Sequence, residues 1–184
     1  MSETNAQKAI RQYAQQQLML VTNKKKCSCH AMADIWGYAV QYYIGRFIDD
    51  KEHYVRDVAY ILSGVDEWAT KSDGTEVGQS PSYGGFNDSG FKPEFKDGSN
   101  QVRHFSAGVM GGFRYGLLAY MLHGVLRPDS LLRRDSPQDE ALNDESTWLG
   151  YLLKGGLSVS GVQRHIENNV CLQKCGICNG GAGR

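Results

Sequence analysis

"AMADIWGYAVQYYIGRFI", residues 31–48, carries the clearest helical pattern in the chain. Its apolar side chains recur at intervals of three and four residues, which places them on one face of an α-helix. These side chains are Met32, Ile35, Trp36, Ala39, Val40, Tyr43, Ile44 and Phe47. A helix with one broad apolar face must bury that face against other elements, so the stretch predicts a packed helical domain.

The same spacing extends this prediction along the rest of the chain. No stretch has the regular alternation of a half-buried strand, so the predicted fold class is mostly α. We expect one domain over residues 1–184, built as a bundle of about six helices. Besides 31–48, the predicted helices cover about 5–22, 53–70, 102–126 and 137–154, with a last one that reaches about residue 173.

One long segment, at about 71–100, interrupts the helices with Gly, Ser, Asp and Pro. A loop of about thirty residues inside a compact domain is usually either functional or disordered. Disordered segments tend to lack aromatic residues, yet this one contains Tyr83, Phe86, Phe91 and Phe95. We therefore expect an ordered loop that covers part of the bundle and is anchored by its rings.

The charge and hydrophobic content of the chain narrow the classes of partner that we expect for it. The chain has 184 residues, is 41% hydrophobic, and balances 20 Lys and Arg against 20 Asp and Glu. A neutral chain lacks the basic surface that nucleic acids require, so we expect no nucleic-acid partner. Segment 105–126 is long enough to span a bilayer, but Arg114 would be costly in lipid, which favours a buried helix. The N-terminus shows no charged-then-apolar leader, so we expect synthesis in the cytoplasm, with export by a dedicated route left open.

Four polar residues precede the helix predicted at 102–126: Asn100, Gln101, Arg103 and His104. Histidine is the usual general acid or base near neutral pH, and an adjacent arginine can stabilise an oxyanion or a phosphate. Asn100 would orient either group. A carboxylate would orient the imidazole, and the candidates are Asp144, Asp66 and Glu67. The alternative is that His104 only caps the start of the helix.

The same predicted helix contains several glycines, among them Gly108, Gly112 and Gly116, which are each four residues apart. Glycine inside a helix costs about 0.5–1 kcal/mol relative to alanine, so something must offset that cost. Two explanations stay open. The glycines either admit a neighbouring helix at close range or leave room for a ligand beside His104.

Two segments resemble a known class of protein. "SNQVRHFSAGVMGGFRYG" (99–116) and "ALNDESTWLGYLLKGG" (141–156) are similar to the C-terminal modules of RHS-type and related polymorphic bacterial toxins. Arg103 and His104 match the first motif of these modules, and Asn143 and Asp144 match the second. The resemblance covers about residues 86–156 and implies a hydrolase-like effector. Its expected substrate is a cell-envelope or nucleotide compound, and a cognate protein partner is compatible with it.

Five cysteines lie near the two ends of the chain. The pair Cys175 and Cys178 has the C-x2-C spacing of a zinc half-site, and Cys27 and Cys29 lie next to His30. Together these four cysteines, with His30 and Cys171 in reserve, are the candidate ligands of a structural tetrahedral zinc that joins the chain ends. Disulfides between the two groups and free thiols are the alternatives.

Motifs of the common enzyme classes are absent from the sequence. We find no phosphate-binding G-x-x-x-x-G-K-[ST], no H-E-x-x-H and no G-x-S-x-G. Two functional hypotheses therefore remain. The first is a small hydrolase-like enzyme with Arg103 and His104 in its centre. The second is a non-catalytic helical binding domain whose ends are clasped by zinc.

Overall fold

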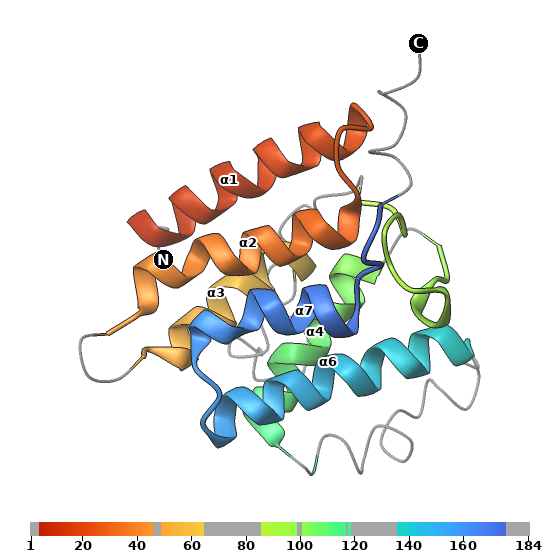
Figure 1. The fold of residues 1–184 in the computed structure, drawn as a ribbon. Helices are drawn as coiled ribbons and strands as arrows, with labels where there is room; N and C mark the ends of the chain where they lie inside the picture. The colour runs from red at the N-terminus through yellow and green to blue at the C-terminus, as the bar shows by residue number, and fades with distance from the viewer. Residues whose placement is uncertain are drawn as a thin grey trace, which may run out of the picture.

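The computed structural model describes residues 4–45, 49–64, 86–98, 101–116, 118 and 136–175. These residues form six α-helices, two 3-10 turns and no strand beyond one isolated bridge, so the predicted mostly-α bundle is confirmed (Figure 1). The elements are α1 (Asn5–Thr22), α2 (Ser28–Tyr43), α3 (Lys51–Ser63), η1 (Pro93–Phe95), α4 (Gln101–Tyr115), α6 (Pro137–Gly155), η2 (Val159–Gly161) and α7 (Val162–Asn169). None of the helices in this part of the chain has the length and apolar character needed to cross a membrane.

The first two helices form an antiparallel hairpin (Figure 1). A capping box starts α1: the Thr4 hydroxyl accepts a hydrogen bond from the Gln7 amide, and the Gln7 side chain accepts one from the Thr4 amide. This arrangement satisfies two backbone donors that a helix start would leave unpaired. A short turn around Lys24, whose φ is +55°, then reverses the chain into α2.

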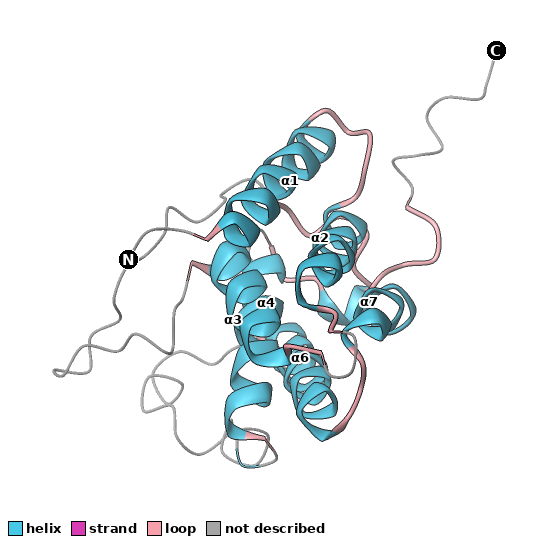
Figure 2. Ribbon diagram, turned by 90° about the vertical axis from the view of Figure 1, so that its left-hand side faces the viewer, coloured by secondary structure: helices cyan, strands magenta, loops and turns pink. Residues whose placement is uncertain are grey.

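Helix α2 lies at the centre of the bundle and has α1, α3 and α7 as neighbours. Figures 1 and 2 both show α7 beside α2. The predicted apolar face of α2 is buried at Met32, Ile35, Trp36 and Ala39. The Trp36 ring meets the Tyr54 ring of α3 edge to face at 5.5 Å, and the Tyr54 hydroxyl donates to the Trp36 carbonyl at 2.8 Å. Burying side chains of this size contributes about 1.5–3 kcal/mol each.

Three predicted helices are shorter in the structure. Helix α2 ends at Tyr43, because Ile44 adopts an extended conformation. Helix α3 ends at Ser63, because Gly64 takes a left-handed conformation with φ of +75°. Helix α4 ends at Tyr115, where Gly116 has φ of +63°, so the helix predicted to continue to residue 126 does not do so unbroken. The sequence places glycine after α3 and α4, and glycine is the usual residue at such ends.

The long predicted loop is ordered over the part that the structure describes, residues 86–98. Phe86, Phe91 and Phe95 are buried, as expected of anchoring rings. Phe91 forms an isolated antiparallel bridge with Cys171. The Ser89 carbonyl accepts a hydrogen bond from the Cys29 amide at the start of α2. The segment therefore links α2 to the C-terminal part of the chain, while residues 71–85, including Tyr83, lie outside the described residues.

Candidate functional site

The candidate histidine lies on the first turn of α4, beside the first turn of α6. His104 Nδ1 is 3.4 Å from Asp139 Oδ1, and the two side chains are 36% and 17% exposed. Catalytic hydrogen bonds are often long in ligand-free proteins and shorten when substrate binds, so this distance fits an imidazole–carboxylate pair. The pair is open to solvent on the imidazole side, which a general acid or base requires.

Asp139 owes its place to the way α6 begins. Ser136 is the N-cap, Pro137 holds the first helical position, and the Ser136 hydroxyl accepts a hydrogen bond from the Asp139 amide at 3.1 Å. The carboxylate therefore lies at the positive end of the helix dipole, which stabilises its charge. The sequence marks this helix start clearly, but only the packing of α6 on α4 shows that Asp139 meets His104.

The structure replaces one predicted partner of His104. Asp144 is exposed on α6, and Asp139 is the carboxylate that approaches the imidazole. The reason is helical geometry: Asp139 and Asn143 are four residues apart and share a face, whereas Asp144 is turned by a further 100°. The remaining predicted members, Asn100 and the acids Asp66 and Glu67, lie outside the described residues.

Two buried amide side chains lie close in the sequence to this pair. Asn143 is buried one helical turn after Asp139, and Gln101 is buried one turn before Phe105 at the start of α4. Gln101 Oε1 has no hydrogen-bond partner among the described residues. A buried oxygen of this kind is costly unless something pairs with it. Arg103, between Gln101 and His104, is exposed.

The glycines of α4 are explained by contact with α6. A Cβ on Gly108 would overlap the Ser146 side chain, and a Cβ on Gly112 would overlap the Thr147 backbone. In return, a Cβ on Gly150 would overlap the Val109 carbonyl. Of the two explanations for the glycines, close helix packing is therefore correct for Gly108 and Gly112.

These contacts also give the direction of the two helices. Gly108 meets Ser146, Gly112 meets Thr147, and the Lys154 ammonium donates to the Arg114 carbonyl at 2.9 Å. Residue numbers rise together on both sides, so α4 and α6 run parallel. Their N-terminal ends therefore lie at the same end of the pair, where His104 and Asp139 meet.

The four cysteines that the structure describes pair as disulfides. Cys27 is joined to Cys175, with a Cα–Cα distance of 6.1 Å, and Cys29 is joined to Cys171, at 5.5 Å. A sulfur in a disulfide is not a thiolate and cannot serve as a zinc ligand. Within the described residues no group of His, Cys, Asp and Glu is arranged to hold a metal ion. In this oxidised state the predicted zinc set of Cys27, Cys29 and Cys175 does not fit a metal, and Cys178 lies outside the described residues.

His30, the nitrogen ligand of that predicted set, lies beside the disulfides. It lines a pocket of about 690 Å³ together with Leu20, Lys25, Lys26, Cys27, Gln173, Lys174 and Cys175. Its Nδ1 atom is buried and has no hydrogen-bond partner among the described residues. The sequence grouped His30 with the cysteines as a metal ligand, whereas the three lysines reach the same pocket through the α1–α2 turn and the C-terminal segment.

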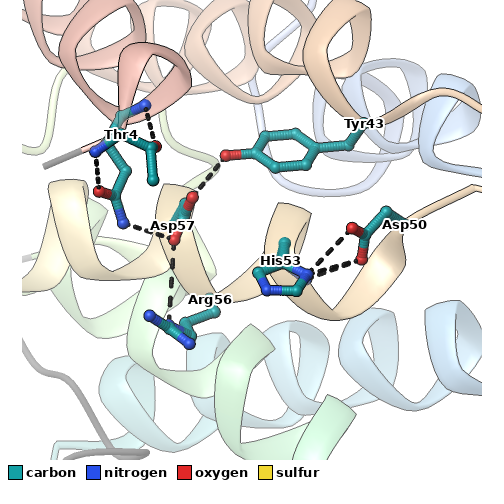
Figure 3. A network of polar contacts seen from close by, with 7 residues as sticks. Thr4, Tyr43, Asp50, His53, Arg56 and Asp57 are labelled. Atoms are coloured by element: carbon teal, nitrogen blue, oxygen red, sulfur yellow. Dashed lines mark hydrogen bonds and ion pairs between the residues drawn. The ribbon is translucent and has the colours of Figure 1, made fainter.

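A second polar cluster, around Asp57 of α3, was not singled out by the sequence (Figure 3). Asp57 is 3% exposed. Its carboxylate accepts hydrogen bonds from the Tyr43 hydroxyl at 2.5 Å and from the Gln7 side-chain amide at 2.8 Å, and Arg56 Nε lies 4.0 Å away. Burial, and then the bond to Asp57, raise the pKa of Tyr43 well above its ordinary value. The cluster joins α1, α2 and α3 and leaves the carboxylate little access to solvent.

Comparison of the chain with family models, with curated proteins and with solved structures gives no match.

Proposed function

We propose that this chain is a small hydrolase-like effector domain in which His104 is the general acid and base and Asp139 orients its ring. The observation that carries the proposal is the half-exposed His104–Asp139 pair. A carboxylate at Nδ1 fixes the ring and its tautomer, and it leaves Nε2 to take a proton from water or from a nucleophile. Such proton transfer typically contributes 10²–10⁴-fold to a rate.

The surrounding charges support chemistry on an anionic group. The parallel helices α4 and α6 bring two N-terminal ends together, and each end carries roughly half a positive charge. Arg103 is exposed on the same turn of α4 as His104. A guanidinium and two helix N-termini stabilise a phosphate, or the oxyanion of an acyl-transfer intermediate. This fits hydrolysis of a nucleotide or of a cell-envelope compound.

The resemblance to polymorphic toxin modules supports the same placement. Arg103 and His104, which match its first motif, lie on α4, and Asn143, which matches its second, is buried on α6 one turn from Asp139. We propose that Asn143 binds substrate or holds Asp139. Asp144 matches the second motif but is exposed, so we assign it no part in orienting the imidazole.

A second candidate function is a non-catalytic helical binding domain with clasped ends. The filled glycine face favours it, because Gly108 and Gly112 pack a helix and leave no room there for a ligand. In this case the His104–Asp139 contact only helps to join α4 to α6. The clasp is made of disulfides in the oxidised chain and would be zinc in a reduced one. About one zinc per reduced chain by metal analysis would support the zinc form.

Growth of bacterial cells that express the chain separates the two functions. Wild type is compared with His104→Ala, Asp139→Asn and the control Asp144→Asn. We expect wild type and Asp144→Asn to inhibit growth, and the other two variants to lose the inhibition while keeping wild-type melting temperatures. Inhibition by His104→Ala equal to that by wild type, or no inhibition by wild type in either compartment tested below, would contradict the enzyme.

The compartment in which growth stops reports the substrate class. Disulfides form and persist in oxidising compartments, so we propose that the chain works after export. With an added export leader, inhibition indicates a cell-envelope substrate. Inhibition without the leader, in the cytoplasm, indicates a nucleotide substrate. A cognate protein partner would show itself as a co-expressed protein that restores growth.

A further inference from the structure

The two disulfides differ in access to solvent. Cys29 and Cys171 are both fully buried, whereas Cys175 is 9% exposed and lines the pocket beside Lys25, Lys26 and Lys174. Thiol–disulfide exchange requires a thiolate to reach one sulfur atom, so access decides which disulfide reacts. Both Cys27 and Cys175 line the pocket, and Cys175, at 9% exposed against 1% for Cys27, is the more accessible of the two.

Cys27 is placed to leave as a thiolate. It is the N-cap residue of α2, where the helix dipole favours negative charge. Lysine side chains around the same pocket favour the thiolate further. A thiol whose thiolate is stabilised leaves faster during exchange. The Cys27–Cys175 disulfide therefore combines an accessible sulfur with a good leaving group.

An unsatisfied nitrogen and the leaving sulfur both lie close to Gly90. Cys27 Sγ and His30 Nδ1 lie 3.2 Å and 3.4 Å from the point that a Cβ on Gly90 would occupy, so both atoms border the same small volume. His30 Nδ1 is buried without a hydrogen-bond partner among the described residues. A disulfide sulfur is a poor partner for it, whereas a thiol or thiolate at Cys27 can exchange a proton with the imidazole.

We propose that the Cys27–Cys175 disulfide is a thiol–disulfide exchange site for anionic thiols and dithiols, while Cys29–Cys171 is a structural cross-link. A thiolate of the incoming dithiol attacks Cys175 Sγ and forms a mixed disulfide. The Cys27–Cys175 bond breaks, and Cys27 leaves with the electron pair and takes a proton through His30. The second thiolate of the same dithiol then attacks the dithiol sulfur that is bound to Cys175. A disulfide forms within the reagent, and Cys175 leaves as a thiolate and takes up a proton. The chain gains two electrons and two protons, and the dithiol becomes a disulfide.

The pocket charge sets the preference among reagents. Lys26 pairs with Asp34 and donates to Gln17, so part of its charge is compensated. Lys174 is exposed at the pocket rim. A cationic pocket concentrates anions and speeds their reaction, by roughly tenfold at low salt, and salt screens the effect. This property distinguishes the site from a disulfide that is merely exposed, and it does not depend on the function proposed for His104.

Three small thiols of different charge test the proposal on the full oxidised chain. The variant Cys178→Ser is used throughout, so that the fifth thiol cannot exchange. The chain is treated with mercaptoethanesulfonate, mercaptoethanol or cysteamine, quenched with acid, alkylated and mapped by mass spectrometry. We expect Cys27–Cys175 to open at least about tenfold faster than Cys29–Cys171, with the mixed disulfide on Cys175. Per thiolate, the anionic thiol should react fastest and the cationic thiol slowest, and high salt should remove the difference.

Variants with matched controls assign the pocket residues. Lys174→Gln should lower the rate with the anionic thiol. Lys8→Gln should not, because it makes the same change on an exposed lysine at the N-terminal end of α1, whereas the pocket lies at the C-terminal end of that helix. His30→Gln should slow opening of Cys27–Cys175 without changing Cys29–Cys171. The proposal is overturned if both disulfides open together at the rate of global unfolding. It is equally overturned if reagent charge has no effect, or if the oxidised chain does not contain Cys27–Cys175.

Discussion

Two polar clusters of this bundle each centre on an aspartate, and they differ in what surrounds the carboxylate. Asp57 is 3% exposed and receives hydrogen bonds from α1 and α2. The Asp139 carboxylate is 17% exposed and lies 3.4 Å from the imidazole of His104, which is 36% exposed. A buried carboxylate with strong partners stabilises the fold, and removing its partners is costly. A half-exposed pair contributes little to stability.

This difference indicates why His104 is the better functional candidate. The contact between α4 and α6 does not depend on the pair, because Gly108, Gly112 and Gly150 let the two backbones touch. The first turn of α4 is therefore held in place by packing further along the helix. A site whose geometry is fixed by a rigid contact, and whose own side chains remain accessible, is suited to chemistry.

The largest predicted effect on stability comes from the close contact between α4 and α6 at Gly112. Gly112→Ala would drive a methyl group into the Thr147 backbone, so we expect a loss of about 3 kcal/mol or more in the free energy of unfolding, or failure to fold. Gly111→Ala is the control, since nothing lies within 4 Å of its added Cβ, and it should raise stability by about 0.5–1 kcal/mol. Denaturant unfolding measures both. Equal effects would mean that α4 is not held against α6 in this way.

The Asp57 cluster gives the next largest effect. Asp57→Asn replaces an acceptor with an amide that must face two donors, from Tyr43 and Gln7, so we expect a loss of about 2 kcal/mol. Glu52→Gln removes the same charge from an exposed position of the same helix and should change stability by less than about 0.5 kcal/mol. The comparison of denaturation midpoints checks both values. Similar losses from the two variants would remove the contrast between the clusters.

Alkaline pH tests the burial of two tyrosines. Burial raises the pKa of Tyr54 well above 10.0, and burial with the bond to Asp57 raises that of Tyr43. Below pH 10 these hydroxyls are neutral in the folded and unfolded chains, so their contribution to the free energy of unfolding is fully present. Above pH 10 only the unfolded chain ionises, and stability should fall by about 1.4 kcal/mol per pH unit for each tyrosine. Tyr43→Phe should make that slope shallower by one tyrosine, and an unchanged slope would place Tyr43 in solvent.

Much of the fold could be predicted from the sequence, because capping residues and apolar spacing act within a single helix. The helix start at Pro137 follows from Ser136 as a capping residue, and the buried face of α2 follows from its spacing. The ends were harder to predict, since Gly64 and Gly116 stop helices whose apolar pattern continues. Sequence spacing gives the face of a helix but not the partner that covers it.

The candidate site could be predicted only in part for the same reason. His104 is notable in the sequence because it opens a glycine-rich helix, but its partner Asp139 depends on the register of two parallel helices. The cysteine clusters predicted that the chain ends meet, yet ligand spacing alone does not separate zinc from disulfides. The cluster around Asp57 was missed because no local pattern marks a residue whose partners, Gln7 and Tyr43, come from two other helices.

The smallest predicted effect concerns the stability contribution of His104. His104→Ala should lower the free energy of unfolding by less than about 1 kcal/mol, because the pair is half-exposed. His165 is the comparison, since it lies 2.8 Å from Glu145, is only 16% exposed and joins α7 to α6. His165→Ala should cost more than His104→Ala in the same denaturant experiment. The reverse order would make His104 a structural residue.

Nitrogen NMR of the His104 ring tests its orientation by Asp139. In the neutral imidazole, we expect the proton on Nδ1, facing the carboxylate, and a free lone pair on Nε2. The variant Asp139→Asn should lose this preference, while Asp144→Asn should keep it. A ring protonated on Nε2 in the wild-type chain, or a tautomer that does not respond to Asp139→Asn, would contradict a general base oriented by this carboxylate.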